Sequence, residues 1–434
     1  MALQEITKNL FGFVQNSKII FLSWDPASFD STTLAKLFIR IKFTNTKGET
    51  QTLPVSPSNA VLVSNILKRI NEQKKLVVVG HNFKILFTLF KRLTSKTIPL
   101  QNLFDLGWYE SYYSLPSSLN NPSLMTSHLK KWFADEYAIK IYKNIFFKLI
   151  TQTLPNIESV GLVNVNLGLL VFPNFVVEGQ ANGRLSCVCE YKRCYNPHSL
   201  SDEEKQELNL YSSDEFFVWF DYRNMEVSVL AELANDEFLK KIIIGNPMTV
   251  YEKIFEIATG TTNPDARRIA KQMFLPCIYG QAQNGLAKSL DISVDQAAIY
   301  LHNLRDKFSK SFEYVEKFQQ IAAETNTATD AFGRIRRFEQ DDSFKARNFA
   351  VQAPSALLCL EALVRLESAC NGNFEVIFTV HDGYVISAKK PVLEEAYKLA
   401  KKCLQETSDL IPIELNVSTK IGRNLAKMQN IGRR

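Results

Sequence analysis

The sequence predicts a multidomain protein of mixed α/β and α+β class. Its 434 residues are enough for two or three domains, and 46% hydrophobic with 22% charged residues is an ordinary globular composition. Strand and helix patterns alternate through residues 1–115, whereas residues 216–419 contain a buried strand, a long helical region and a late pair of strands. Two sheets of different construction are therefore expected.

Charge and cysteine content narrow the class of protein. The net charge is +6, which is compatible with a nucleic-acid partner but does not require one. Seven cysteines, an odd number in a long chain, indicate reduced thiols in a cytosol-like compartment. No run of 18 apolar residues occurs, and the start MALQEITKNLF is too polar for a signal peptide, so we expect no membrane association. The expected location is cytoplasmic, the host cytoplasm for a viral protein, with an organelle as the alternative.

The N-terminal elements follow from their patterns. KIIFLSWD and KLVVVGHN are apolar runs typical of buried strands, and FKILFTLFKRL has helical spacing. In chain order we expect a strand at 18–25, a hairpin over 37–53, a helix at 60–73, a strand at 75–82, a helix at 83–93, and a further element at 103–113. Residues 123–154 predict one or two helices, and residues 182–200 form an irregular basic segment that follows a strand and turn at 171–182. Within that segment, a C-x-C-x4-C-x3-H spacing (Cys187, Cys189, Cys194, His198) fits the common zinc patterns poorly.

The C-terminal region is organised around Phe216–Asp236. Residues 216–220 are a continuous apolar strand that ends on a carboxylate, Asp221, and the following apolar residues recur at helical spacing. An acid at a strand end is most often a cap or turn residue. Downstream we expect helices at 236–244, 248–259, 265–279, 284–326 (two or three), 345–370 and 391–410, a basic hairpin at 331–343, two strands joined by a turn over 374–388, and a last strand at 412–419.

A second acid, Asp382, lies at the tip of the 374–388 hairpin, in the sequence His381-Asp382-Gly383. Asp-Gly is a common turn signal, so this motif alone is weak. Two acids that are each carried by a buried strand can, however, converge on divalent metal. Mg²⁺ prefers one or two carboxylates plus phosphate oxygens, and two such ions suit in-line displacement at phosphorus.

The helix at 265–279 carries a pattern suited to a nucleotide. Residues at i, i+4, i+8 and i+12 share one slowly drifting helix face. On this helix they are two cations, an apolar residue and an aromatic residue: Arg267, Lys271, Leu275 and Tyr279. Cations fit a triphosphate, and apolar and aromatic side chains fit a base and sugar; a solvated amphipathic helix is the simpler alternative.

These three stretches, in this order, resemble the family A DNA polymerases. The family's motifs DYSxIELRxLAxxS, RxxxKxxxFxxxYG and VHDE correspond here to DYRNMEVSVLAELAN, RRIAKQMFLPCIYG and VHDG. NGRLSCVCEYKRCYNPHSL and NFAVQAPSALLCLEAL resemble two accessory segments of the family. The resemblance covers about residues 180–425 and is specific when the motifs are taken together.

The resemblance implies a right-hand polymerase in which Asp221 and Asp382 bind two Mg²⁺ ions, with Mn²⁺ as a substitute. Tyr222 is assigned to the same metal and nucleotide set, and Arg267 and Lys271 would hold the triphosphate, with Lys271 able to give a proton to pyrophosphate. Leu275 and Tyr279 would lie beside the sugar and the templating base pair, and Glu226 would be the steric gate against a ribose 2′-OH. Residues assigned to DNA are Arg184, Asn348, Gln352, His381, Arg334 and Arg336.

The N-terminal third resembles a degraded 3′–5′ exonuclease of the same family, with an RNase H-like fold. The family's DxE reads Asp25-Pro26-Ala27 here, NxxxD reads Asn82 to Leu86, and no good YxxxD follows. The implied domains are a degenerate exonuclease at 1–115, a reduced thumb at 116–175, and palm and fingers at 176–434, with the fingers at about 240–326. Hydrolysis should be lost with the missing carboxylates.

Several positions depart from the family pattern. Gly383 replaces an acid, Ser228 an Arg, and Leu275 an aromatic residue, while Pro276 is expected to kink its helix by clashing with the Gln272 carbonyl. Leu357 and Phe344 replace an Asp and an Arg.

The implied activity is template-directed DNA synthesis on a primer 3′-OH with dNTPs, replicative and without proofreading, in a phage-type enzyme. A processivity factor or helicase–primase is an expected helper. A single-subunit RNA polymerase and a non-catalytic nucleic-acid-binding relative remain as alternatives.

Overall fold

A computed structural model gives the structure of the chain. It describes residues 10, 19–28, 38–45, 47, 49–72, 76–81, 83, 103–115, 117, 122–134, 136–146, 148, 163–164, 169–170, 174–176, 180–188, 196–207, 214–370, 372–408 and 410–431. The chain divides into two compact units. The N-terminal unit comprises Met1–Asn156, Val171–Gly179 and Leu185–Asn196, and the C-terminal unit comprises Ile157–Leu170, Gln180–Arg184 and Pro197–Arg434.

The N-terminal unit contains a mixed five-stranded sheet in the order β3-β2-β1-β4-β5. Its strands are β1 (Ile19–Ser28), β2 (Phe38–Asn45), β3 (Thr50–Val55), β4 (Val77–Gly80) and β5 (Leu103–Asp105). β1 is antiparallel to β2 and parallel to β4, β2 is antiparallel to β3, and β4 is parallel to β5. The strands and the hairpin expected from the apolar runs are confirmed, although β1 continues past Asp25 instead of ending there.

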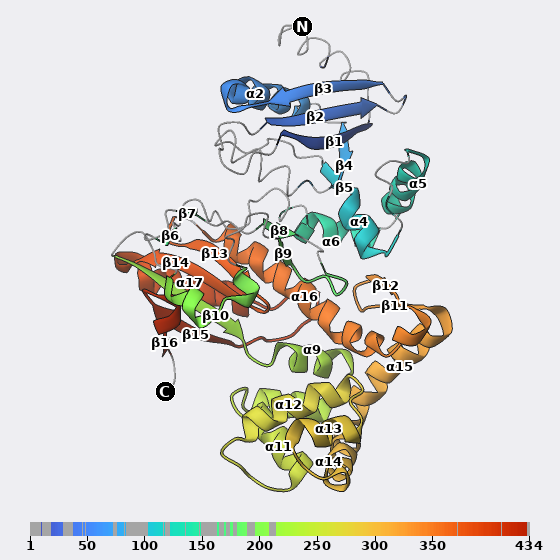
Figure 1. The fold of residues 1–434 in the computed structure, drawn as a ribbon, viewed down its shortest axis with the longest axis vertical. Helices are drawn as coiled ribbons and strands as arrows, with labels where there is room; N and C mark the ends of the chain where they lie inside the picture. Colours follow the sequence, from blue (N-terminus) through green and yellow to red (C-terminus); the bar gives the residue numbers. More distant parts are fainter. Residues whose placement is uncertain are drawn as a thin grey trace. The chain divides into compact units, whose positions relative to one another are not determined.

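Helices accompany this sheet (Figure 1). They are α2 (Ala60–Asn71), α4 (Leu106–Tyr112), α5 (Pro122–Phe133) and α6 (Glu136–Ile141), which continues as a π-helical turn at Tyr142–Phe146. α2 buries Val63, Ile66, Leu67 and Ile70, the one-sided spacing that predicted it, and contacts β3. Of the helix expected at 83–93, only Phe83 belongs to the described residues. In chain order, five short elements follow α6 and precede the C-terminal sheet. They are β6 (Val163–Asn164), β7 (Leu169–Leu170), β8 (Asn174–Val176), β9 (Ser186–Val188) and α8 (Asp202–Glu207).

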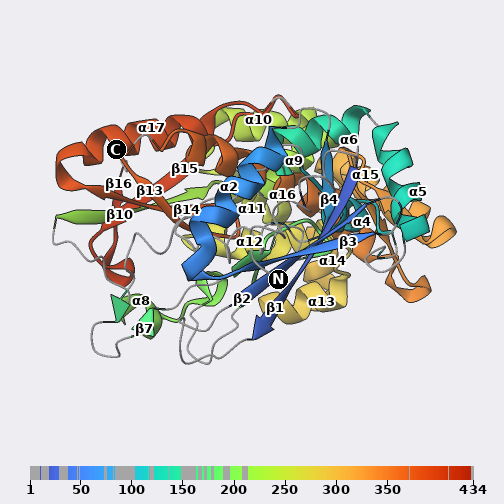
Figure 2. The same ribbon diagram turned by 90° about the horizontal axis from the view of Figure 1, so that it is seen from above.

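The C-terminal unit is built on an antiparallel sheet in the order β13-β14-β10-β15-β16. Its strands are β10 (Glu215–Tyr222), β13 (Glu375–Val380), β14 (Gly383–Lys389), β15 (Val417–Gly422) and β16 (Gln429–Ile431). α16 (Lys345–Ser368) and α17 (Leu393–Gln405) cover one face of this sheet (Figures 1 and 2). Phe220 stacks on Tyr397 of α17, and the Tyr384 hydroxyl donates to the Cys359 carbonyl of α16. Because side chains alternate along a strand, the residues between these point to the opposite face.

α16 is the central helix of the unit. By length and hydropathy it could cross a membrane, but 78% of its most apolar stretch is buried inside the protein, which is typical of a core helix. It runs without a break through Pro354, and the described part of the chain contains no other helix that passes this test.

The helical region expected between the strands is confirmed. It consists of α9 (Met225–Leu233), α10 (Glu237–Gly245), α11 (Val250–Thr259), α12 (Ala266–Ile278), α13 (Gln283–Leu290), α14 (Val294–Lys307) and α15 (Ser309–Thr325). α11 to α14 gather around one core, in which the rings of Phe274 and Phe308 meet at 5.0 Å (Figure 1). Gly260, with φ 71°, ends α11 in the left-handed conformation that favours glycine.

Three expected features differ in the structure. The basic hairpin is β11 (Thr327–Thr329) with β12 (Ile335–Arg337), which begins before the expected 331–343. The last expected strand, 412–419, overlaps β15 only from Val417 onward. Ile413 and Leu415 alternate inward like strand residues, but ladder hydrogen bonds begin only at Val417. Pro276 lies in the last turn of α12, which continues to Ile278, so it does not interrupt the middle of the helix.

Candidate active site

Asp221 and Asp382 come to the same end of the C-terminal sheet. Asp221 lies opposite Gly383 in the pairing of β10 with β14, and Asp382 lies in the turn between β13 and β14. The backbone amide of Tyr222 donates to the Asp382 carbonyl at 3.3 Å. His381 has φ 54°, so a left-handed turn residue directly precedes the second acid. The expected convergence of the two acids is therefore built into the strand register.

The electrostatics of this pair favour a cation. Burial, followed by the charge of Asp221, raises the pKa of Asp382 to about 6. Loss of hydration also raises the pKa of Asp221, against the opposing effects of Lys271 and then Lys420. The two carboxylates thus repel each other in a partly dehydrated site, and a divalent cation would relieve both costs.

The donors fit magnesium in number and kind. Among the described residues no group of three or more His, Cys, Asp and Glu side chains is arranged to hold a metal. Two carboxylates alone leave most of a Mg²⁺ coordination shell to water, backbone and substrate oxygens, which is the arrangement that Mg²⁺ prefers in phosphate chemistry. Asp221 and Asp382 would hold such ions.

Tyr222 contributes only its backbone to this site. Its side chain is buried, and its hydroxyl donates to the Leu404 carbonyl at 2.7 Å. The alternation of β10 turns this side chain toward α17, away from the acids. A direct side-chain contact between Tyr222 and a nucleotide is therefore incompatible with its position in the core.

The cations of α12 lie over one aromatic ring. Arg267 Cζ and Lys271 Nζ are each 5.5 Å from the centroid of Tyr251 in α11. The four residues expected to share a helix face, from Arg267 to Tyr279, all remain partly or fully exposed, whereas Ala270, Phe274 and Cys277 point into the core. Tyr251 was not identified from the sequence, because it precedes the motif and has no spacing relation to it.

Glu226 is the centre of a second polar group. Arg184 Nη2 lies 2.7 Å from Glu226 Oε1, and the Tyr279 hydroxyl donates to Glu226 Oε2. Burial, followed by the charge of Glu226, raises the pKa of Tyr279 well above its usual range. Three residues that the sequence places 42 and 53 positions apart are thus brought together at the start of α9. Leu275 lies one turn before Tyr279 and packs against the helical core.

The residues assigned to DNA fall into two classes of environment. Asn348 and Gln352 are half-buried and one turn apart on α16, and Gln352 Oε1 accepts a hydrogen bond from Asn182 Nδ2 at 3.3 Å. His381 is exposed, with its ring 5.5 Å from that of His198. These side chains are accessible to a ligand.

The two hairpin arginines are less accessible. Arg334 is only 4% exposed, and a Cβ added to Gly183 would stand 2.9 Å from its guanidinium. Arg336 is half-buried over the Phe338 ring at 5.0 Å. Arg334 thus packs on the 180–184 segment, which carries Arg184.

Other residues singled out in the sequence lie mostly outside the described part of the chain. Of the cysteine–histidine cluster, only the His198 side chain is described; burial, then His381, lowers its pKa to about 4. Asp25 of β1 is paired with Arg40 of β2, but the side chain of Asp25 lies outside the described part of the chain. Asn82 and Leu86 also lie outside the described residues.

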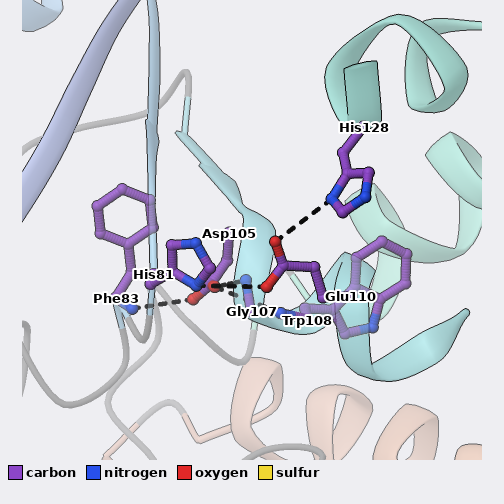
Figure 3. Close-up of polar contacts among 7 residues, drawn as sticks. All are labelled: His81, Phe83, Asp105, Gly107, Trp108, Glu110 and His128. Atoms are coloured by element: carbon purple, nitrogen blue, oxygen red, sulfur yellow. Dashed lines mark hydrogen bonds and ion pairs between the residues drawn. The ribbon is translucent and has the colours of Figure 1, made fainter. Parts of the chain in front are cut away.

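The N-terminal unit has a buried polar cluster of its own, drawn in Figure 3. Asp105 accepts hydrogen bonds from the backbone amides of Phe83 and Gly107, both at 2.9 Å. Glu110 lies between two histidines, with Oε1 3.3 Å from His128 Nδ1 and Oε2 3.8 Å from His81 Nδ1. The two carboxylates and the two histidines are buried or nearly so, which indicates a structural cluster.

Comparison with known proteins places this geometry in a family. The model of "DNA polymerase family A" matches residues 173–427, more than half of the chain. DNA polymerase I of Bacillus caldotenax is 25% identical over 215 residues, and that of Borreliella burgdorferi is 24% identical over 275 residues. The matches cover 45% and 58% of this chain but 24% and 29% of those proteins, so the chain matches only about a quarter of the length of these relatives.

The fold agrees with a solved structure. The POL domain of Pol1 from M. smegmatis, solved with DNA primer-template and dNTP, superposes with a TM-score of 0.67 at 14% identity, covering 98% of this chain and 99% of that chain. At a sequence identity of 14%, this similarity establishes the fold alone. From the family match, whose range contains both acids, the α12 cations and Glu226, the chain belongs to DNA polymerase family A.

Proposed function

We propose that this protein is a DNA-directed DNA polymerase that adds dNTPs to a primer 3′-OH. The observation that carries the proposal is the Asp221–Asp382 pair at one end of the C-terminal sheet, with Lys271 close enough to lower the pKa of Asp221. Relatives named DNA polymerase I, and a solved relative that holds primer-template and dNTP, support the same activity.

In the proposed reaction the primer 3′-hydroxyl gives its proton to water, its oxygen forms a bond to the α-phosphorus, and the bond from that phosphorus to pyrophosphate breaks. Bound Mg²⁺ would supply charge stabilisation at the reacting oxygens. Asp221 and Asp382 would hold it through their carboxylate oxygens. Lys271 and Arg267 neutralise the triphosphate, and Lys271 is the proton source for the departing pyrophosphate. The ring of Tyr251 contacts both cations through cation–π interactions.

The direct test is Asp382→Asn in a primer-extension assay with dNTPs and Mg²⁺. Loss of one metal-binding carboxylate removes several kcal/mol of charge stabilisation, so we expect extension to fall by at least about 10³-fold. Primer–template affinity should stay within about threefold, since the remaining DNA contacts are intact. Substantial extension by the variant would contradict the site, and absence of extension by the wild type would contradict the function.

Glu226 favours DNA synthesis over RNA synthesis. Its carboxylate is fixed by Arg184 and Tyr279, so it cannot easily turn away from a ribose 2′-OH. We predict that Glu226→Ala raises incorporation of rNTPs relative to dNTPs by about 10- to 100-fold, in line with 1–3 kcal/mol of discrimination. A wild-type enzyme that extends primers equally well with rNTPs would instead support the RNA polymerase alternative.

We further propose that the enzyme is replicative, lacks proofreading and depends on a helper for processivity. The support is the sequence of the N-terminal unit, where Ala27 and Leu86 stand at positions that need acids. Its sheet order, β3-β2-β1-β4-β5, is compatible with an exonuclease-derived shell. Mg²⁺-dependent shortening of a 3′-labelled primer by the wild type would contradict the lack of proofreading.

A further inference from the structure

Trp219 shares with Asp221 the face of the C-terminal sheet that points away from α17. The two residues are two positions apart on β10, and side chains alternate along a strand. Phe220 and Tyr222 point to α17, as their contacts with Tyr397 and Leu404 show. The half-buried indole of Trp219 therefore lies on the same face as the exposed carboxylate of Asp221.

The indole also closes the space beside Asp382. A Cβ added to Gly383 would stand 3.1 Å from Trp219 Nε1, 3.0 Å from the Phe220 carbonyl and 3.2 Å from the Val380 carbonyl. Gly383 does not have a positive φ, so backbone conformation does not explain the glycine. A side chain at this position would therefore push its neighbours by a few tenths of an ångström, and Trp219 supplies the only side-chain atom among these three contacts.

Two neighbours define what the indole can contact. Phe378 meets the Trp219 ring edge-to-face, with centroids 6.4 Å apart and planes at 89°, which fixes the ring's orientation. Lys420 lies directly opposite Trp219 in the pairing of β10 with β15. Its side chain is exposed, and within the described chain no carboxylate forms an ion pair with it.

The face beside the two acids thus presents an aromatic ring and an ammonium group next to each other. Lys420 is also close enough to lower the pKa of Asp221. A ring next to a cation is complementary to the sugar and the phosphate of a nucleotide. The triphosphate already has cations from α12, so the reactant left for the sheet is the end of the primer.

We propose that Trp219 is a positioning residue that supports the sugar of the primer's last nucleotide, while Lys420 holds the adjacent phosphate. The inference depends on the proposed polymerase function. It also accounts for Gly383, since the indole occupies the room that a side chain at that position would need.

The test compares Trp219→Ala, Trp219→Phe and Lys420→Gln in single-turnover primer extension. We expect Trp219→Ala to lower the extension rate by about 3- to 10-fold, the size of one aromatic contact, without changing the apparent dNTP affinity. Trp219→Phe retains a ring and should recover most of the rate. Lys420→Gln should weaken primer–template binding and reduce its logarithmic salt dependence by about one.

Lys389→Gln is the matched control, because Lys389 is an exposed lysine at the far end of the neighbouring strand, opposite Glu215. It removes the same charge and should change neither rate nor salt dependence. A wild type that extends primers, with Trp219→Ala and Lys420→Gln both indistinguishable from Lys389→Gln, would overturn the inference and leave the polymerase function standing. A wild type that extends nothing would overturn both.

If Trp219→Ala folds poorly, a binding measurement that uses only the wild type and Trp219→Phe still tests the inference. Primer–template should quench part of the tryptophan fluorescence of the wild type, and Trp219→Phe should remove that part of the signal. Equal quenching in both proteins would contradict a contact between Trp219 and DNA.

Discussion

Asp105 and Asp221 are both acids at the end of a buried strand, and they have opposite surroundings. Asp105 ends β5 and is 4% exposed. Its carboxylate accepts hydrogen bonds from three backbone amides, those of Phe83, Gly107 and Trp108, and it caps α4. Asp221 is exposed on β10, and within the described chain no donor is hydrogen-bonded to its carboxylate.

The same local pattern, an acid at the end of a buried strand, thus gives a helix-capping acid in one unit and an acid able to bind a cation in the other. A capping acid accepts hydrogen bonds from backbone amides, and three such bonds occupy most of the roughly four acceptor sites of a carboxylate. An acid that accepts no such hydrogen bonds, and that stands beside a second acid, keeps its lone pairs and its charge for a cation. The N-cap of α9 is Asn224, three residues after Asp221, so Asp221 is not needed for capping.

The largest effect should separate the two acids by activity. We predict that Asp221→Asn lowers primer extension by at least about 10³-fold, because it removes a metal-binding charge. Asp105→Asn should leave the rate per folded molecule within about twofold, since its carboxylate is occupied by amides. The measurement is single-turnover extension with the active fraction determined by burst titration. Comparable losses in both variants would show that the contrast between the two acids is wrong.

Stability should show the reverse order. Asp105→Asn places an amide NH₂ where a backbone N–H now donates, and we expect a loss of about 2–3 kcal/mol in the N-terminal unit. Asp221→Asn should cost little, or stabilise, because it removes a charge that repels the neighbouring carboxylate of Asp382. Hydrogen exchange of peptides covering residues 103–112, compared with peptides covering 215–222, measures both effects locally. Unchanged protection of 103–112 in Asp105→Asn would contradict the structural role.

Much of the fold and of the site could be predicted, because the information was local in the sequence. The strands of both sheets follow from apolar runs, and the face of α12 follows from four residues at helical spacing. The convergence of Asp221 with Asp382 was predicted from the fact that each ends or joins buried strands. The pairing of β10 with β14 and β15 then determines which residues lie beside these acids.

The missed features depend on contacts that no local pattern encodes. Tyr251 meets Arg267 and Lys271 only because α11 packs on α12. Lys420 lies opposite Trp219 because β15 pairs with β10, although the two residues are 201 positions apart in the sequence. Period-two alternation alone, by contrast, would have placed Trp219 on the same face as Asp221. The last strand was misplaced because the alternation of Ile411, Ile413 and Leu415 indicates an extended chain but not where ladder bonds begin.

The last effect concerns pH, and it again distinguishes an acid beside a second acid from an acid that accepts hydrogen bonds from backbone amides. Burial raises the pKa of Asp382 to about 6, above the value of about 4 expected in the unfolded chain. Below pH 4 both states hold the proton and above pH 6 neither does; between these values only the folded state holds it. Without divalent metal, the stability of the C-terminal unit should therefore fall by on the order of 2–3 kcal/mol as pH rises from about 4 to about 6, and remain lower above that.

Asp382→Asn is the control for this effect, because it cannot ionise and should lose that part of the pH dependence. Since Mg²⁺ binds the ionised form, added Mg²⁺ should raise the melting temperature of the wild type more at pH 7 than at pH 5, and should do little for the variant. Melting curves of both proteins at the two pH values, with and without Mg²⁺, measure this. A wild type whose response to Mg²⁺ is equal at both pH values would mean that Asp382 is satisfied by protein groups, as Asp105 is, and that the two strand-end sites do not differ in kind.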